Sequence, residues 1–597
     1  MDMQSSISKQ KDIGTNDVIF SEVQNVMTKL EAAEGSSIFF IDKCVYMAFR
    51  YLGLLKSLFE NKKEIIGHFM LSETIDYLPA DQLIYFVSPD LDNLRSLVVH
   101  ILSYTKRFPS AVPHIYFVPH KPLIVEQVLD EEYKLFQAFP KLKLEELDVD
   151  MFFLEANRMS MEVPKAFYRL YASGDITPLT WAARGILKLQ ATRYGAIPCI
   201  RGKGEQAAQV VRMLRGLQNE VGKQFLTEIA PEIDTLLILD RSLDFVTPLL
   251  TQLTYEGLLD ELYGINACEV CFPFSISESA HVGDGVELTN RDKVFAELRD
   301  KNFSSVGTCL YQKSVWVKQN YEKRKDVQQL KELKEFIKVL PEMQEYHQRV
   351  GMHTSIATEV GRVTQDFNFG KRIEMEHNLI QQNNVKDVFE YIEDLVFRKE
   401  PLPSVLRILC LYSMINGLKL KVYESIKESM MLVYGIPQIM SVFFNLERCG
   451  LLAVADGRPT VVPNYSHVRK VFQTWCQHLN EEQPNDIAYT YSGYAPPLAR
   501  LVDSLIGNPR SWGSGNSLVD QLPGPKEELT SHIDLPTASK RVMVFVVGGI
   551  TAGEASALRF VESQLTRAGH CNEMIIASTD ITNGNRLMDS LIPFASM

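Results

Sequence analysis

The stretch from residue 234 to 265 constrains the fold more than any other part of this 597-residue chain. It begins with an uninterrupted apolar or β-branched run, Thr235 to Leu239, which stops at Asp240 and Arg241, with a second acid at Asp244. A run of that length without polar residues is typical of a strand covered on both faces, as in a parallel sheet with helices on each side. The residues after the acids favour a helix that starts without a break. The segment therefore predicts an α/β domain with a charged corner between a buried strand and a helix.

The acids of this corner admit two interpretations. Ligands of doubly wound α/β folds gather at the carboxyl ends of strands, so Asp240 and Asp244 would suit a catalytic site. In a structural corner, Asp240, Arg241 and Asp244 would instead tie the strand to the helix by charge-assisted hydrogen bonds. Thr247 would then be the helix N-cap, and Pro248 would occupy the first turn. Because no partner base or nucleophile accompanies the acids, we favour the structural interpretation.

Strand-sized apolar runs alternate with helical stretches in the first third of the chain, at residues 37–42, 83–87 and 115–118. Such alternation predicts a mostly parallel sheet with helices on its faces. A second α/β series begins with a run at residues 151–154 and includes the opening segment. It also contains a predicted helix at 181–194 and a predicted strand at 197–200.

The periodicity becomes helical from residue 290 to 480, and strand-like runs return at 541–547 and 574–578. The simplest topology places these late strands in the same sheet as residues 235–239. The helical part is then an insertion into a discontinuous α/β domain. Residues 507–540 are rich in Gly, Pro and Ser and predict a long surface loop.

Composition excludes several classes of protein. The net charge of −12 argues against a general nucleic-acid binder, which usually carries a basic stripe. The N-terminal residues lack the apolar core of a secretory signal, and the longest apolar run, 542–547, is too short to span a bilayer. Nine scattered cysteines suggest reduced thiols in the cytosol. Cys268 and Cys271 form one CxxC pair, but a zinc site normally needs a second, so we expect none there.

Motifs of catalysis and cofactor binding are incomplete. The Gly-Lys-Gly at 202–204 lacks the upstream glycine and the Ser or Thr of a Walker loop. The Gly-Gly at 548–549 lacks the third glycine of a dinucleotide fingerprint, so close strand–helix packing explains it better. No HExxH, GxSxG or kinase motif set occurs. An enzyme is therefore disfavoured, and we expect neither a metal nor a cofactor. The scattered histidines, interpreted as single solvated or hydrogen-bonded side chains, are His114, His120, His347 and His353.

An amphipathic helix is predicted at residues 327–343, because apolar residues recur every three or four positions and Lys and Glu fill the other face. Pro341 falls inside this pattern, where it should kink or end the helix. The interrupted stripe would then be open to a partner helix, or it would simply face the core. Periodicity alone favours the core. The apolar positions are Val327, Leu330, Leu333, Phe336, Ile337, Leu340 and Met343.

The charged corner and the residues after it, at 240–261, resemble the signature of the SM (Sec/Munc) family of SNARE-binding membrane-fusion proteins. Further likenesses lie at 194–198, 298–303, 486–496 and 546–559. The runs that are similar to the class C vacuolar protein sorting branch, the SM subunits of the HOPS and CORVET tethers, are 253–257 (LTYEG), 340–344 (LPEMQ), 353–357 (HTSIA) and 445–452 (NLERCGLL). The family signature is matched at Asp240, Arg241, Asp244, Pro248, Tyr255 and Asp260.

The resemblance implies a fold of α/β plus helical class: an arch of three domains, two with α/β parallel sheets and one mainly helical. On this sequence domain 1 would span 1–150. Domain 2, discontinuous, would span 151–265 and 485–597, and domain 3, inserted between its halves, 266–484. Domain 3 would divide into a helical hairpin at about 290–372 and a second part at about 373–484.

In this family the helical hairpin binds SNARE helices. The resemblance therefore implies that the amphipathic stripe is a binding site for single SNARE motifs and assembled bundles. SNARE motifs are amphipathic and fold only on pairing, so a groove that holds two in register would template them. Pro341 is expected at the hairpin bend, and His353 at the start of the return helix. The other matching positions are Leu333, Phe336, Ile337, Leu340, Met343 and Gln344.

A second partner is implied, the helical-repeat class C vacuolar protein sorting subunit of the same tether. It would dock on residues 427–440, where we select Lys427, Ile436 and Ile439, although the two isoleucines could equally be core residues. The chain would be cytoplasmic and would reach early endosome, late endosome and lysosome membranes through its partners. Nucleic acid is not expected as a partner.

The resemblance therefore implies a non-enzymatic regulator that binds and templates SNARE helices as part of a tethering complex in endosome and lysosome (vacuole) trafficking. Two alternatives stay open. One is a structural tether subunit without direct SNARE binding. The other, less favoured, is an α/β hydrolase or phosphoryl-transfer enzyme that uses Asp240 and Asp244.

Overall fold

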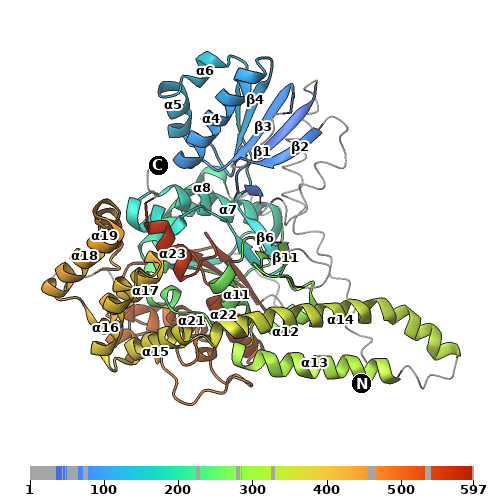
Figure 1. Ribbon diagram of the computed structural model, residues 1–597, viewed down its shortest axis with the longest axis vertical. Helices are drawn as coiled ribbons and strands as arrows, with labels where there is room; N and C mark the ends of the chain where they lie inside the picture. Colours follow the sequence, from blue (N-terminus) through green and yellow to red (C-terminus); the bar gives the residue numbers. More distant parts are fainter. Residues whose placement is uncertain are drawn as a thin grey trace. The chain divides into compact units, whose positions relative to one another are not determined.

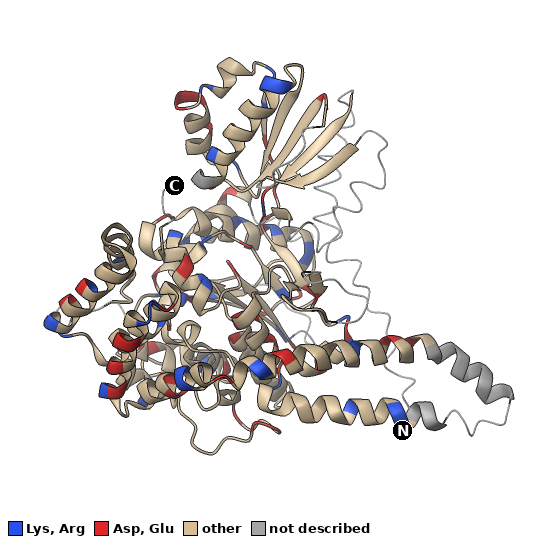
Figure 2. Ribbon diagram, in the orientation of Figure 1, with Lys and Arg blue, Asp and Glu red and all other residues tan. Residues whose placement is uncertain are grey.

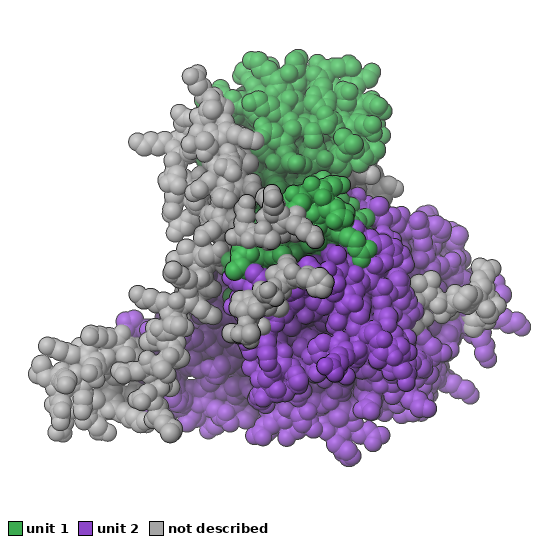
Figure 3. Space-filling model, turned by 180° about the vertical axis from the view of Figure 1, so that it is seen from behind, with its two compact units in different colours: residues 1–164, 179–196, 213–230 green, residues 165–178, 197–212, 231–597 purple. Residues whose placement is uncertain are grey.

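The computed structural model describes residues 35–593 apart from 44, 47–48, 50–64, 72–77, 223–228, 277–282, 284, 324–329, 453, 455–463 and 532–539. For the helical residues 91–92, 320–323 and 330–340 it describes the backbone alone. The chain forms two compact units, coloured separately in Figure 3. Unit 1 comprises residues 1–164, 179–196 and 213–230, and unit 2 comprises 165–178, 197–212 and 231–597. The three-domain boundaries implied by the resemblance stay a prediction.

Unit 1 contains a five-stranded parallel sheet in the order β2-β1-β3-β4-β5, with helices packed against it (Figure 1). The strands predicted at 37–42, 83–87 and 115–118 are β1, β3 and β4. Their side chains are buried on both faces, as uninterrupted apolar runs require. The elements are β1 (Ser37–Ile41), β2 (Ile65–Met70), β3 (Gln82–Val87), α4 (Leu91–Arg107), β4 (Val112–Phe117), α5 (Leu123–Glu131), α6 (Leu135–Ala138) and β5 (Lys143–Glu146).

After this sheet, unit 1 continues with a short antiparallel hairpin of β6 (Phe152–Glu155) and β7 (Arg158–Ser160). The helix predicted at 181–194 is present as α7 (Thr177–Leu189), which continues as a π-helical turn from Gln190 to Tyr194.

Unit 2 contains the second sheet, in which neighbouring strands run in the order β12-β8-β9-β13-β14. Strands β8, β9, β13 and β14 are parallel, and β13 lies between β9 and β14, so that Val547 pairs with Asp240. This confirms the prediction that the late strands share the sheet of residues 235–239. The elements are β8 (Cys199–Lys203), the first part of α8 (Glu205–Val221), whose residues from Met213 on belong to unit 1, β9 (Thr235–Asp240), α21 (Pro497–Gly507), β12 (Lys526–Thr530), β13 (Arg541–Val547), α22 (Ala552–Arg567) and β14 (Glu573–Ser578).

The prediction of a long surface loop at 507–540 is wrong in part. Residues Lys526–Thr530 form β12, an antiparallel strand on the edge of the sheet beside β8. Its charged side chains alternate between exposed and half-buried positions, as an edge strand allows, and they gave no apolar signal. Short 3-10 turns form at Pro509–Gly513 and Leu518–Gln521, and residues 532–539 lie outside the described part.

The helical insertion is confirmed, and it belongs to unit 2. Its two longest helices, α13 and α14, lie side by side as a hairpin (Figure 1). Within the described residues, no helix is long and apolar enough to cross a bilayer. The remaining elements of unit 2, inside and outside the insertion, are α10 (Val246–Leu249), α11 (Tyr255–Tyr263), β10 (Glu269–Cys271), β11 (Gly285–Glu287), α12 (Lys293–Leu298), α13 (Phe303–Lys323), α14 (Leu330–Thr364), α15 (Phe367–Gln381), α16 (Val385–Phe397), α17 (Leu402–Asn416), α18 (Leu420–Tyr434), α19 (Ile436–Cys449), α20 (Tyr465–Phe472) and α23 (Gly584–Leu591).

The predicted bend at Pro341 is wrong, because α14 runs without interruption through it. The dihedral angle of proline suits a helix, and its cost is one lost backbone hydrogen bond and crowding of the preceding turn. Pro341 is exposed, so water can reach the freed carbonyl group. Pro341 therefore does not mark the bend of the hairpin, and His353 lies within α14 rather than at the start of a return helix.

Candidate protein-binding surfaces and the charged corner

The charged corner is a buried network centred on Arg241. One guanidinium nitrogen, Nη1, donates to both carboxylate oxygens of Glu554 at 2.8 and 2.7 Å. Nε donates to the backbone carbonyl of Asp244 at 2.9 Å, and Nη2 lies 3.4 Å from the carboxylate of Asp244. All three side chains are buried. A buried guanidinium is tolerated only when such partners compensate its charge, so this arrangement is structural.

Asp240, at the end of β9, is surrounded by donors from the protein itself. Its Oδ1 accepts hydrogen bonds from the Tyr171 hydroxyl at 2.6 Å and from the backbone N–H of Ser242 at 2.8 Å. Its Oδ2 accepts from the backbone N–H of Gln206, at the start of α8, at 2.7 Å. Burial, followed by the charge of Asp240, holds the pKa of the Tyr171 hydroxyl well above its ordinary value, so Tyr171 remains a donor. The anion position at the N-terminus of α8 is thus filled by Asp240.

The Gly-Lys-Gly segment beside this corner is the packed end of β8 and the residue that follows it. A Cβ atom on Gly204 would lie 2.3 Å from the Cβ atom of Asp240, which leaves no space for a phosphate between them. The Lys203 ammonium donates to the carbonyl of Gly524 at 2.7 Å. Burial, followed by the charge of Lys526, lowers the pKa of Lys203 to about 8.

Asp244, rather than Thr247, caps the helix that follows. Its Oδ1 accepts from the backbone N–H groups of Val246 at 3.1 Å and Thr247 at 3.0 Å, and Thr247 donates its hydroxyl to Oδ2. The predicted N-cap at Thr247 is therefore wrong, and Pro248 lies inside the single turn of α10. The helical part of the segment consists of two separate helices. The chain extends after α10, and α11 begins separately with Thr254 as its N-cap.

Tyr255 and Asp260, the other signature residues, anchor α11. The Tyr255 hydroxyl lies 2.9 Å from Nδ1 of His353, whose Nε2 lies 3.1 Å from Asp292. Asp260 accepts from the backbone N–H of Ile265 at 2.9 Å. Although burial opposes the Asp292 carboxylate, the hydrogen bond and charge of His353 hold the pKa of Asp292 below its ordinary value. His353 is fully buried, so its predicted contact with a SNARE helix is wrong for this conformation.

The hairpin of α13 and α14 is the first candidate binding surface. Pro341 and Gln344 are exposed and Met343 is half-buried. The side chains of the other predicted positions, Leu333, Phe336, Ile337 and Leu340, lie outside the described residues, although their backbone is helical.

Two exposed aromatic residues of α13 were missed by the sequence analysis. Tyr311 is 71% exposed and Trp316 is 48% exposed. The Trp316 ring packs edge-on against Tyr346 of α14, with ring centroids 5.6 Å apart. Exposed aromatics on a helical hairpin are typical of protein-binding surfaces. The weak apolar periodicity of α13 gave no signal for them.

The second candidate surface lies on α18 and α19. Ile436 is 63% exposed, whereas Ile439 is fully buried in the helical core, so the prediction that both isoleucines bind a partner is wrong for Ile439. The Lys427 ammonium donates to the Tyr423 hydroxyl at 3.1 Å and lies 5.4 Å from the centre of the Phe443 ring. Lys427 is thus half-buried beside the surface.

Helical phase explains the difference between the two isoleucines. Positions 436, 440 and 444, four residues apart, lie on one face of α19, and positions 439, 442, 443 and 446 face the core. The outer face carries an exposed apolar stripe, the α19 stripe, which includes the end of α18. The stripe consists of Leu432 (88% exposed), Ile436, Met440 and Phe444.

Charge does not distinguish these surfaces. Figure 2 shows Lys and Arg scattered among Asp and Glu over the described elements rather than gathered on one of them.

Comparisons with known proteins agree on a single family. A model of the Sec1 family matches residues 56–590. Vacuolar protein sorting-associated protein 33A of Rattus norvegicus is 36% identical over 538 residues, which cover 86% of this chain and 88% of that protein. The vacuolar protein-sorting-associated protein 33 homolog of Arabidopsis thaliana is 30% identical, with 86% of each chain covered.

Solved structures show the same fold. The SM protein Vps45 in complex with the Qa SNARE Tlg2 has a TM-score of 0.56 at 17% identity and covers 96% of this chain and 97% of its own. The Unc18–syntaxin 1 complex from Monosiga brevicollis has a TM-score of 0.56 at 17% identity and covers 96% of this chain and 98% of its own.

Proposed function

Because the chain belongs to the Sec1 family, we propose that it regulates SNARE-driven membrane fusion in vacuolar and endosomal trafficking. The match spans most of the chain, and the relatives above carry the name vacuolar protein sorting-associated. Within this role the chain acts at endosome and lysosome membranes through its partners and performs no catalysis. Asp240 and Asp244 support that view, because protein donors and helix N–H groups occupy their carboxylate oxygens.

The observation that carries the proposal is the long hairpin of α13 and α14. It offers two packed helices with exposed aromatic side chains at Tyr311 and Trp316. An amphipathic SNARE helix would bury its apolar face against such a surface, in the helix-in-groove mode. Solved proteins of this fold are described in complex with a Qa SNARE and with syntaxin 1.

For the tether partner, we propose the α19 stripe as the docking surface. A helical-repeat class C vacuolar protein sorting subunit would cover the exposed apolar side chains at Leu432, Ile436, Met440 and Phe444. Lys427 would lie at the edge of the contact. This revises the set of contact residues, since Ile439 supports the stripe from the core instead of touching the partner.

Binding measurements with the full chain test both surfaces. We expect Tyr311→Asp and Leu340→Asp each to weaken binding of an isolated SNARE motif about tenfold or more, equivalent to about 1.4 kcal/mol. The same variants should still capture the class C helical-repeat subunit. Ile436→Asp should show the opposite pattern, which makes it the matched control. Titration calorimetry and co-purification provide the readouts, and circular dichroism checks folding.

Each rival function has its own outcome. A chain that binds the helical-repeat subunit but no SNARE motif or assembled bundle would be a structural tether subunit. If Ile436→Asp and Tyr311→Asp weakened both partners equally, neither surface would be specific and the assignment would fail.

A further inference from the structure

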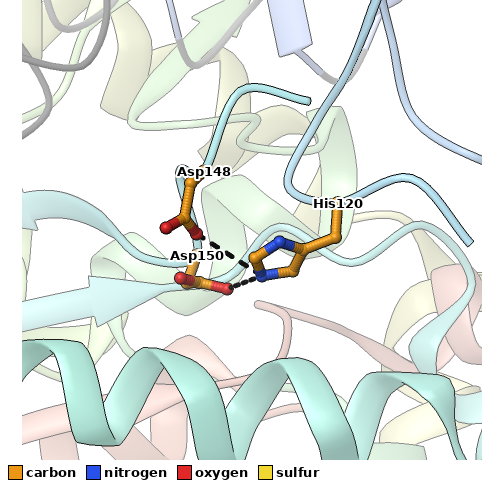
Figure 4. A group of neighbouring side chains, drawn as sticks. All are labelled: His120, Asp148 and Asp150. Carbon is orange, nitrogen blue, oxygen red and sulfur yellow. Dashed lines mark hydrogen bonds and ion pairs between the residues drawn. The ribbon is translucent and has the colours of Figure 1, made fainter. Parts of the chain in front are cut away.

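His120, Asp148 and Asp150 form a compact cluster in unit 1 (Figure 4). His120 follows β4, and the two acids lie in the connection between β5 and β6. Nε2 of His120 lies 2.7 Å from Oδ1 of Asp150 and 3.5 Å from Oδ1 of Asp148. His120 and Asp150 are more than nine-tenths buried, whereas the Asp148 side chain is 43% exposed. The cluster is therefore built inside the protein with one ligand at the surface.

Two buried polar atoms of this cluster have no hydrogen-bond partner. They are Oδ1 of Asp148, which faces the imidazole ring, and Nδ1 of His120. A buried polar atom without a partner costs about 1–3 kcal/mol, and an ion is one of the few groups that satisfy it. A cation beside Nε2 would satisfy the Asp148 oxygen directly. It would also fix the proton of His120 on Nδ1, where Glu146 lies 3.8 Å away as an orienting carboxylate.

The geometry suits zinc. Zinc binds imidazole nitrogen and carboxylate oxygen at about 2.0–2.2 Å in a tetrahedron, so its ligand atoms lie about 3.3–3.5 Å apart. The three ligand atoms here lie within 4.8 Å of one another. The 3.5 Å between Nε2 and Asp148 matches that spacing, whereas the 2.7 Å between Nε2 and Asp150 is a direct hydrogen bond that widens when an ion replaces its proton. A cavity of about 30 Å³ lies beside the two carboxylates and has room for one water, although His120 does not line it.

The surroundings hold the ligands in place. The Lys188 ammonium lies 3.2 Å from Oδ2 of Asp148, so it steadies the carboxylate and leaves Oδ1 towards the histidine. Helix α7 approaches closely at Gly185, where an added Cβ atom would lie 2.9 Å from the Cβ atom of Asp150.

We propose that His120, Asp148 and Asp150 form a zinc site, with Nε2 and one oxygen of each carboxylate as ligands and one water as the fourth. Zinc displaces the proton shared by His120 and Asp150, which is released to solvent. The bound ion ties the end of β4 to the connection between β5 and β6. The site departs from our expectation of no metal, because its ligands are separated in the sequence and form no zinc-binding motif.

Zinc binding to the full chain tests this site. After dialysis against a chelator, titration with Zn²⁺ should load about one equivalent, as measured by calorimetry and by elemental analysis after gel filtration. Asp148→Asn should weaken binding at least tenfold, because an amide oxygen is a poorer zinc ligand than a carboxylate. Asp148 is partly exposed, so this variant should fold, and circular dichroism verifies it. Mg²⁺ should not load, since it prefers an all-oxygen octahedron.

Matched variants separate this site from others. His467→Gln removes an exposed histidine and Cys271→Ser removes one thiol of the CxxC pair, and both should bind zinc like the parent chain. Substituted Co²⁺ should show visible d–d absorption without a thiolate charge-transfer band, which identifies nitrogen and oxygen ligands. Failure of the parent to load zinc, unchanged loading of Asp148→Asn, or a thiolate band would each overturn the proposal.

Discussion

Three fully buried arginines, Arg241, Arg299 and Arg407, each contact a buried glutamate. Two of the glutamates, Glu256 and Glu261, lie on α11. Removing one partner of such a pair typically costs about 3–5 kcal/mol, because the remaining charge stays buried. At this scale, compensated charges at Glu256 and Glu261 fix α11 against its neighbours, and Arg241 of the family signature is compensated in the same way by Glu554.

His100 of α4 should make stability depend on acid. Its Nδ1 lies 3.0 Å from the Tyr85 hydroxyl, and its ring centroid lies 4.4 Å from that of Phe40. Burial lowers the pKa of His100 from 6.5 to about 4, so the folded state keeps the imidazole neutral. The unfolded chain takes up a proton below about pH 6.5. The contribution of neutral His100 to the free energy of unfolding is thus complete above pH 6.5. It is lost as the pH falls towards 4, by up to about 3 kcal/mol.

A His100→Gln variant removes this titration. Its free energy of unfolding, from chemical denaturation, should fall less between pH 6.5 and 4.5 than that of the parent chain. His467→Gln, at an exposed position, should keep the parent slope. An identical slope for His100→Gln and the parent would assign the acid sensitivity to other groups.

At the scale of single elements, helical phase and continuity decide which residues can bind. The face of α19 that carries Ile436 is exposed, and the face that carries Ile439 forms the core. In α14, continuity through Pro341 gives one long helix where a bend was predicted. Both elements were predicted as helices. The prediction differs from the structure in which face of α19 is exposed and in where α14 ends.

Pro341→Ala should stabilise α14 locally. Proline in a helix interior costs about 3 kcal/mol relative to alanine, chiefly through the lost hydrogen bond and the clash with the preceding turn. Amide hydrogen exchange at residues 337–345 should therefore slow by tenfold or more, about 1.4 kcal/mol per decade. Gln344→Ala, at an exposed site of the same helix, should change exchange little. Equal exchange in Pro341→Ala and the parent would mean that α14 has already adapted to the proline.

Helices and strands are predicted from the apolar patterns of their sequences. An element without such a pattern is therefore not predicted. Runs such as 541–547 were predicted as strands and confirmed, whereas β12 is charged and was taken for a loop. The buried corner at Asp240 was predicted correctly as structural. The residue that caps the following helix was predicted incorrectly. Asp and Thr are both common N-cap residues, so the sequence did not distinguish Asp244 from Thr247. The cluster at His120 depends on the packing of separate segments, which no local pattern encodes.

At the scale of the whole molecule, unit 2 is a discontinuous sheet with a helical insertion. Strand β9 pairs on one side with β8 and on the other with β13. The core beside them combines Leu237 and Leu239 with Val544 and Val546. The fold of unit 2 therefore depends on residues from both sides of the insertion.

A chain that ends at residue 530 should not fold stably. It would lack β13 and β14, so β9 would lose one of its two neighbours and the apolar core would open to water. Limited proteolysis and analytical ultracentrifugation should show a protease-sensitive, aggregating product. A chain that ends at residue 593 serves as the control and should behave like the parent. A monomeric, protease-resistant product from the shorter chain would mean that β8 and β9 are stable without β13.

The discontinuous sheet also determines when its strands can pair during synthesis on the ribosome. Strand β9 ends at residue 240 and β13 begins at residue 541, so about 300 residues must be translated before the two can pair. At about 5–20 residues per second this delay is about 15–60 s. Throughout that time one edge of an apolar strand stays uncovered in the nascent chain. Its efficient production should therefore depend on chaperones that shield β9 until the last strands emerge.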